Sequence, residues 1–126
     1  MQRAPTVLLV EDEVLIRLHA ADSLRDYGFK VVEAADGHQA RELLKADTSI
    51  DVVFTDITLP GQPDGFGLAQ WIRSRSTYLP IILTSGGHNA AKATEQCGGA
   101  PFFEKPYDIG ELASRIRVML AGEGAG

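Results

Sequence analysis

The chain has 126 residues, 44% of them hydrophobic and 23% charged, which suits one compact domain and leaves no room for a second. Its net charge of -5 argues against a nucleic-acid-binding surface, because phosphate backbones are bound by clustered Lys and Arg. The single cysteine, Cys97, cannot form an internal disulfide and fits a reducing compartment. The sequence contains neither a signal-peptide core nor the roughly 20 apolar residues of a membrane span. We therefore expect a soluble, cytoplasmic protein that does not bind a membrane.

Short apolar runs alternate with helical patterns along the chain. The run from Thr6 to Val10 predicts a buried strand, and the helical pattern that follows it stops at Gly28. The apolar positions of that helix, which we expect to face the core, are Val14, Leu15, Leu18, Ala21 and Leu24. On the same criteria, we expect further strands at about 30–34, 52–55, 80–83 and 101–103, and further helices at about 40–46, 65–74, 88–96 and 108–120.

Five strands that alternate with five helices predict an α/β fold with a doubly wound parallel sheet. Crossovers between parallel strands are right-handed and place helices on both faces. The flavodoxin-like strand order, 2-1-3-4-5, would put the first and third strands side by side. We expect one domain over residues 1–126, with its core at about 5–121 and a short frayed tail from Gly122 to Gly126.

Acidic residues follow the first and third predicted strands. Asp56 ends a run that is apolar enough to be a central strand, and Glu11 and Asp12 end the first strand. In open α/β sheets, ligands bind at the carboxyl ends of the strands, where these acids would be neighbours. Carboxylates placed so close together repel one another unless a cation shares the space. Mg²⁺ suits such a site because it prefers oxygen ligands, and Mn²⁺ is an alternative.

Two further polar residues end the fourth and fifth predicted strands. Thr84 supplies a hydroxyl and Lys105 supplies an ammonium at the same edge of the sheet. Acids, a metal ion, a hydroxyl and an ammonium are the groups that move a phosphoryl group, where catalysis consists mostly of positioning and charge neutralisation. The sequence therefore predicts phosphoryl chemistry at Asp56.

These motifs together resemble a response-regulator receiver domain, the phosphoacceptor half of two-component signalling. The resemblance covers essentially the whole chain. It rests on Val10-Glu11-Asp12, Ala35-Asp36-Gly37, Asp56 with Leu59-Pro60-Gly61 and Asp64-Gly65, Thr84-Ser85, and Lys105-Pro106-Tyr107, each at the end of a strand or the start of a helix. The implied function is a phosphorylation-driven binding switch and not an enzyme.

The resemblance also assigns roles at the acidic site. It implies that Asp56 takes a phosphoryl group from a phosphohistidine and forms an acyl phosphate. Asp12 would bind Mg²⁺ directly and Glu11 through water, with the backbone carbonyl of Thr58 as a further ligand. Glu11 stands where aspartate is more usual, and the loop from Pro60 to Gly65 is one residue longer than the usual one.

The remaining implied roles concern the switch. Thr84 and Lys105 would pair with the phosphoryl oxygens, and Phe102 stands where the family has a rotating aromatic residue. The bond between Lys105 and Pro106 resembles one that is cis in the family. The face made by the fourth helix, fifth strand and fifth helix would then be read by a partner. We expect Asp64 and Asp108 to be helix caps and Asp36-Gly37 to be only a turn.

Several alternatives stay open on the sequence alone. The chain could act by itself, could be the receiver module of a hybrid kinase that shuttles or drains phosphoryl groups, or could be a pseudo-receiver that binds without phosphorylation. The phosphodonor would be a histidine kinase or a histidine phosphotransfer protein, and the chain could be a monomer or a phosphorylation-dependent homodimer. A phosphatase is disfavoured because Thr58 occupies the position of the second aspartate that such enzymes use. A flavodoxin-like cofactor carrier is disfavoured because Glu11-Asp12-Glu13 would repel its phosphate.

Overall fold

Strands and helices alternate along the computed structural model, which describes residues 4–47, 49–76, 78–86, 95 and 99–125. In chain order the elements are β1 (Thr6–Val10), α1 (Val14–Asp26), β2 (Lys30–Ala34), α2 (Gly37–Ala46), β3 (Val52–Asp56), α3 (Gly65–Arg75), β4 (Ile81–Ser85), β5 (Phe102–Glu104) and α5 (Ile109–Ala125). The helix expected at 88–96 lies almost wholly outside the described residues, as does Cys97.

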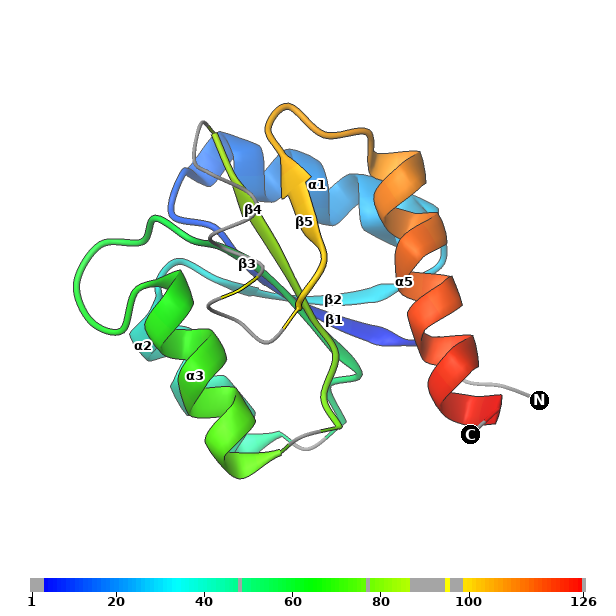
Figure 1. The fold of residues 1–126 in the computed structure, drawn as a ribbon. Helices are drawn as coiled ribbons and strands as arrows, with labels where there is room; N and C mark the ends of the chain where they lie inside the picture. Colours follow the sequence, from blue (N-terminus) through cyan, green and yellow to red (C-terminus); the bar gives the residue numbers. More distant parts are fainter. Residues whose placement is uncertain (1–3, 48, 77, 87–94, 96–98, 126) are drawn as a thin grey trace.

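The five strands form one parallel sheet in the order β2-β1-β3-β4-β5 (Figure 1), which confirms the predicted topology. β1, β3 and β4 are buried at every position, as expected for strands covered on both faces. The register places Val10 opposite Thr55 and Asp56 opposite Thr84. The carboxyl ends of these central strands therefore meet at one edge of the sheet.

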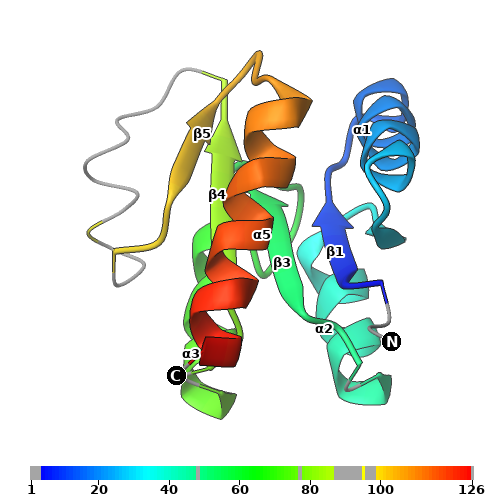
Figure 2. The same cartoon turned by 90° about the vertical axis from the view of Figure 1, so that its right-hand side faces the viewer.

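Two hydrophobic clusters lie on opposite faces of the sheet. Because successive side chains of a strand point to opposite faces, Leu8 and Val10 pack with α2 and α3, while Val7 and Leu9 pack with α1 and α5. Figures 1 and 2 show the two pairs of helices on the two sides of the sheet. The sheet edge that carries the polar residues is thus held between two packed cores.

Aspartate side chains cap three of the helices. Asp64 and Asp108 accept hydrogen bonds from the backbone N–H groups of Gly67 and Glu111, which confirms both predicted caps. Asp36 does more than the turn we expected, because its side chain accepts from the N–H of Gln39 and caps α2. The Gln39 side chain in turn accepts from the N–H of Ala35, so the two side chains satisfy two backbone donors.

The last helix extends beyond its predicted end. Helix α5 continues to Ala125, so residues 122–125 of the expected tail are helical in the structure. A glycine ends a helix when it adopts the left-handed conformation, as Gly28 does after α1 with φ of 97°. Gly122 is not among the glycines with positive φ, and the helix runs through it. None of the helices in the described part of the chain is long and apolar enough to cross a membrane.

Two leucines of α1 give a matched test of the packing. Leu24 is 0% exposed and Leu15 is 81% exposed, although both were expected to face the core. We predict that Leu24→Ala lowers the free energy of unfolding by about 2–5 kcal/mol, because it leaves a cavity in the core. Leu15→Ala should change it by less than about 0.5 kcal/mol. Urea unfolding monitored by circular dichroism measures both, and equal losses would contradict the observed placement of α1.

Candidate functional site

Three carboxylates lie together at the carboxyl ends of β1 and β3. The pairing of these two strands makes Glu11 and Asp12 neighbours of Asp56, and the three residues offer oxygen atoms that lie within 4.8 Å of one another. Glu11 is 2% exposed and Asp56 is 4% exposed, whereas Asp12 lies at the surface. The site is therefore a buried pair of acids with a third acid at its mouth.

Lys105 joins the two buried acids. Its Nζ lies 2.6 Å from Oε1 of Glu11 and 2.5 Å from Oδ2 of Asp56. Burial opposes the charge on Lys105, but the hydrogen bonds to Asp56 and Glu11 raise the pKa of its ammonium above the ordinary value. Burial also raises the pKa of Glu11, and the bond to Lys105 opposes that shift. The Lys105 ammonium thus offsets the free-energy cost of burying two carboxylates side by side.

The sheet itself places Lys105. Its backbone N–H donates to the carbonyl of Ser85 at 3.0 Å, which continues the β4–β5 pairing by one residue. The peptide bond between Lys105 and Pro106 is cis, as the family resemblance implied. The side chain then runs across the carboxyl ends of the strands to the acids of β1 and β3.

Thr58 and Thr84 flank Asp56. The backbone N–H of Thr58 donates to Oδ1 of Asp56 at 2.9 Å, so each oxygen of this carboxylate has a donor. Thr84 lies directly opposite Asp56 in the sheet, and its hydroxyl is buried without a hydrogen-bond partner among the described residues. A buried hydroxyl with no partner is uncommon and marks a place where another oxygen can bind.

A cavity of about 390 Å³ lies at this edge of the sheet, and neither Glu11 nor Thr84 is among its wall residues. Its walls include Asp12, Asp56, Thr58 and Lys105, and therefore join most of the predicted site residues in one pocket. Glu13, Ile16, Ser85 and Gly86 also line it. Glu13 and Ser85 were not predicted as wall residues. Their positions in the sequence, directly after Asp12 and Thr84, could have indicated them.

A larger, apolar groove adjoins this cavity. The groove measures about 530 Å³ and runs between α1 and the start of α5, and it shares Ile16 and Lys105 with the first cavity. Leu15 lines it and, like Val14 and Leu18, is exposed, which corrects the expectation that all three face the core. The first turns of α1 therefore present apolar side chains beside the acidic site.

The predicted switch residue Phe102 lies on the edge strand β5. It is half-buried and packs against the cluster formed by α2 and α3. Leu83, its neighbour in the sheet, immediately precedes Thr84. Phe102 is thus one sheet position from the unpartnered hydroxyl.

Comparison with known proteins assigns the family. The family model of the response regulator receiver domain matches residues 7–117. The chain belongs to this family. It is 38% identical over 115 residues to a protein of Guillardia theta named as the probable transcriptional regulator ycf27, covering 90% of this chain and 44% of that protein. It is 33% identical over 118 residues to the sensor kinase CckA of Brucella abortus, covering 91% of this chain and 12% of that kinase.

Solved receiver structures share the fold. The crystal structure of a response regulator receiver protein from Sinorhizobium medicae superposes with a TM-score of 0.87 at 32% identity, over 95% of this chain and 97% of that one. The curated relatives are longer, and the receiver domain described here spans less than half of the two named above. The family is thus shown over nearly the whole chain.

Gly65 is closely packed against the end of β3 and the residue that follows it. A Cβ added at Gly65 would lie 2.1 Å from the carbonyl oxygen of Asp56 and 2.5 Å from the Cα of Ile57. The start of α3 therefore presses against the backbone of the receiver site. The same test at Gly122 on α5 finds no atom within 4 Å.

These two glycines give a prediction with a built-in control. We expect Gly65→Ala to lower the free energy of unfolding by about 1–3 kcal/mol, because the backbone must shift to admit the methyl group. Gly122→Ala should be neutral or stabilising by up to about 1 kcal/mol, since alanine is the better helix former. Urea unfolding checks the first effect, and a Gly65→Ala variant as stable as the wild type would contradict the packing.

Proposed function

We propose that Asp56 accepts a phosphoryl group from a phosphohistidine of a histidine kinase or a histidine phosphotransfer protein. The observation that carries this proposal is the Lys105 ammonium, shared between Asp56 at 2.5 Å and Glu11 at 2.6 Å beside the unpartnered Thr84 hydroxyl. A carboxylate held this way has a fixed direction of attack and cationic and hydroxyl donors within reach of the group it receives.

The cluster of Glu11, Asp12 and Asp56 suits a hard divalent cation. Its donors are carboxylate oxygens of Glu11, Asp12 and Asp56, and the cavity also admits the carbonyl of Thr58, which suits Mg²⁺ and also Mn²⁺. The ion would neutralise charge on the phosphoryl oxygens as they approach three acids. Among these residues Asp12, at the mouth of the site, offers the most accessible carboxylate.

The transfer is a single displacement at phosphorus. An oxygen of the Asp56 carboxylate forms the new bond to phosphorus while the bond from phosphorus to the imidazole nitrogen breaks. The electron pair of the broken bond stays on that nitrogen, and the product is an acyl phosphate on Asp56. The Thr58 N–H orients the attacking carboxylate, and Lys105 remains close enough to pair with the transferred oxygens.

Phosphorylation would change which groups Lys105 and Thr84 contact. The phosphoryl group adds about two negative charges and strong acceptor oxygens. Thr84 can turn its free hydroxyl to these oxygens, and Phe102 can move into the space that Thr84 leaves. The outer surface of β5 and α5 would then alter and be read by a partner or by a second copy of the chain. The helix expected at 88–96, which is part of the predicted face, lies almost wholly outside the described residues.

The family assignment indicates the biological setting. A receiver is a signalling domain, and we propose that this one works in the cytoplasm as a phosphoacceptor and not as an enzyme with a substrate of its own. The match to a sensor kinase keeps open a role as the receiver module of a hybrid kinase. The described residues offer no second site of comparable acidity for other phosphoryl chemistry.

A mass measurement tests the phosphoacceptor. We predict that acetyl phosphate with Mg²⁺ adds one phosphoryl group to the wild-type chain, that hydroxylamine removes it, and that Asp56→Asn abolishes the gain. Asp64→Asn is the matched control, because asparagine caps helix α3 as well as aspartate does and should leave phosphorylation intact. Intact-protein mass spectrometry reports each state directly.

Two outcomes would contradict the proposal. A phosphoryl group that forms on the Asp56→Asn variant at the wild-type rate would place the acceptor elsewhere. Absence of any gain in the wild type, with or without Mg²⁺, would favour the pseudo-receiver that acts by binding alone.

The apolar groove beside the site suits the protein that donates the phosphoryl group. It shares Ile16 and Lys105 with the acidic cavity, so a donor that brings phosphohistidine to Asp56 must cover it. Exposed Leu15 stands in this groove, and burying a leucine contributes about 1.5–3 kcal/mol. A small donor such as acetyl phosphate needs no such contact.

This difference between donors yields a prediction. The protein donor is an autophosphorylated histidine kinase that phosphorylates the wild-type chain. We expect Leu15→Gln to lower the rate of transfer from this kinase by about tenfold, the equivalent of ~1.4 kcal/mol. The rate with acetyl phosphate should not change. Val118→Gln, at an exposed apolar position on α5, is the control and should leave both rates unchanged. Equal loss with both donors would show damage to the site itself and would contradict docking in the groove.

A further inference from the structure

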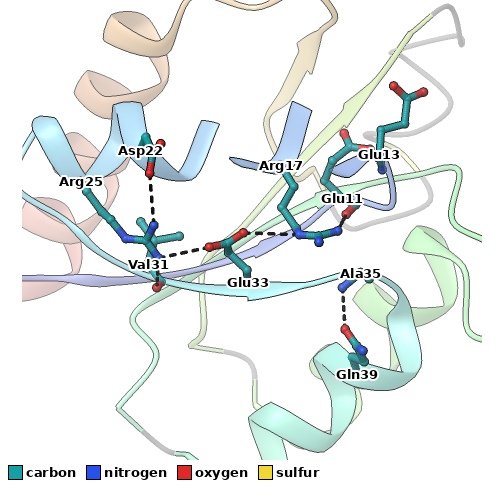
Figure 3. A network of polar contacts seen from close by, with 9 residues as sticks. All are labelled: Glu11, Glu13, Arg17, Asp22, Arg25, Val31, Glu33, Ala35 and Gln39. Atoms are coloured by element: carbon teal, nitrogen blue, oxygen red, sulfur yellow. Dashed lines mark hydrogen bonds and ion pairs between the residues drawn. The ribbon is translucent and has the colours of Figure 1, made fainter. Parts of the chain in front are cut away.

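An arginine on the first turn of α1 reaches back to the acidic site. The Nη1 atom of Arg17 donates to the backbone carbonyl oxygen of Glu11 at 2.9 Å, and its Nε lies 3.4 Å from Oε1 of Glu33 on strand β2 (Figure 3). Both side chains are largely buried, with 16% and 24% of their surfaces exposed. A planar guanidinium held at two places has little freedom to turn.

Glu11 is consequently held at four points. Its N–H donates to the carbonyl of Ala34, and its own carbonyl accepts from Arg17. Its carboxylate accepts from the N–H of Glu13 at 3.1 Å and from Lys105 at 2.6 Å. The contact from Arg17 is the one made to the peptide group that joins Glu11 to Asp12. Because a peptide group is planar, fixing that carbonyl also fixes the backbone N–H of Asp12.

On the other side of Asp12, the N–H of Glu13 donates to Oε2 of Glu11 and holds the peptide group that joins Asp12 to Glu13. The N-cap residue of α1 is Glu13, and no side-chain cap hydrogen bond is made there. Asp12 therefore leads into a helix whose start is not fastened by a capping side chain. The Arg17 contact compensates, because it ties the first turn of the helix to the peptide group in front of Asp12.

We propose that Arg17, held in place by Glu33, is a positioning residue for the metal site. It fixes the backbone at Glu11 and Asp12 and so directs the Asp12 carboxylate toward the position where Mg²⁺ would bind beside Asp56. This inference rests on the proposed function, because it concerns the metal of the same site. Partners of this kind, which hold a ligand and do not touch the metal, are commonly worth 10–100-fold in metal affinity.

Charge and position make opposite predictions for Arg17. Its guanidinium is positive and lies beside the acidic cluster, so by charge alone it repels a cation and its removal should tighten Mg²⁺ binding. By position, its removal loosens Asp12 and should weaken binding. The sign of the change therefore separates the two explanations.

Arg25 provides a control on the same helix. It also pairs with Glu33, with its Nη2 atom 3.3 Å from Oε2, and donates to the carbonyl of Val31 at 3.1 Å (Figure 3). In the described part of the chain, its hydrogen bonds and ion pairs are with Asp22, Val31 and Glu33 and do not include Glu11. Arg25→Gln therefore removes the same charge and a Glu33 ion pair and leaves the contact to the Glu11 carbonyl.

Isothermal titration of Mg²⁺ into the chain without any phosphodonor tests the inference. We expect Arg17→Gln to raise the Kd for Mg²⁺ roughly tenfold, and Arg25→Gln to leave it within about twofold of the wild type. Arg17→Lys keeps the charge but cannot bridge both partners, so it should also bind Mg²⁺ more weakly. A second readout is hydrogen exchange, without Mg²⁺, at the Glu13 amide, which donates to Oε2 of Glu11. This exchange should be faster in both Arg17 variants and unchanged in Arg25→Gln.

The outcomes separate this inference from the proposed function. If the wild type does not bind Mg²⁺, both fail together. If the wild type binds Mg²⁺ and Arg17→Gln binds it equally or more tightly, only the positioning role fails. A loss of affinity in Arg25→Gln as large as that in Arg17→Gln would show a general effect of the Glu33 ion pairs and would also overturn it. Should Arg17→Gln fail to fold, the same comparison is made with Arg17→Lys.

Discussion

The functional site depends on one interaction, the pair of ion pairs that the Lys105 ammonium makes with Glu11 and Asp56. Two carboxylates buried side by side at adjacent strand ends are costly unless a cation compensates them. Lys105 does so at 2.5–2.6 Å from both. The arrangement keeps a cation beside the buried Asp56 carboxylate and within reach of any group that is attached to it.

The sheet order is what makes this contact available. With β1 beside β3 and β4 beside β5, residues from the first, middle and last parts of the chain end at one edge. The hydrogen bond from Lys105 to the carbonyl of Ser85 couples that edge to β5, on which Phe102 stands. Lys105 therefore links the acids at the ends of β1 and β3 to the end of β5.

The sequence predicts those features that depend on strand ends and says less about those that depend on packing. Parallel strands with a known order place Glu11, Asp12, Asp56, Thr84 and Lys105 together, and the structure brings these residues together. Helical periodicity gives the apolar positions of α1 but not how far the helix overlies the sheet, so Leu15 was expected in the core and is exposed. The link from Arg17 through Glu33 joins a helix to an edge strand, and no spacing in the sequence encodes such a contact. The end of α5 was missed because a glycine stops a helix only in the left-handed conformation, which composition does not reveal.

A crystal structure of the chain with Mg²⁺ and beryllofluoride, a mimic of the phosphoryl group on aspartate, tests the central role of Lys105 most directly. We expect the Lys105 ammonium to leave Glu11 and contact a fluoride on Asp56. The Thr84 hydroxyl should donate to another fluoride, and Phe102 should turn toward the space beside Thr84. A structure in which beryllofluoride is bound while Lys105 still bridges Glu11 and Asp56, with Thr84 unmoved, would contradict the account.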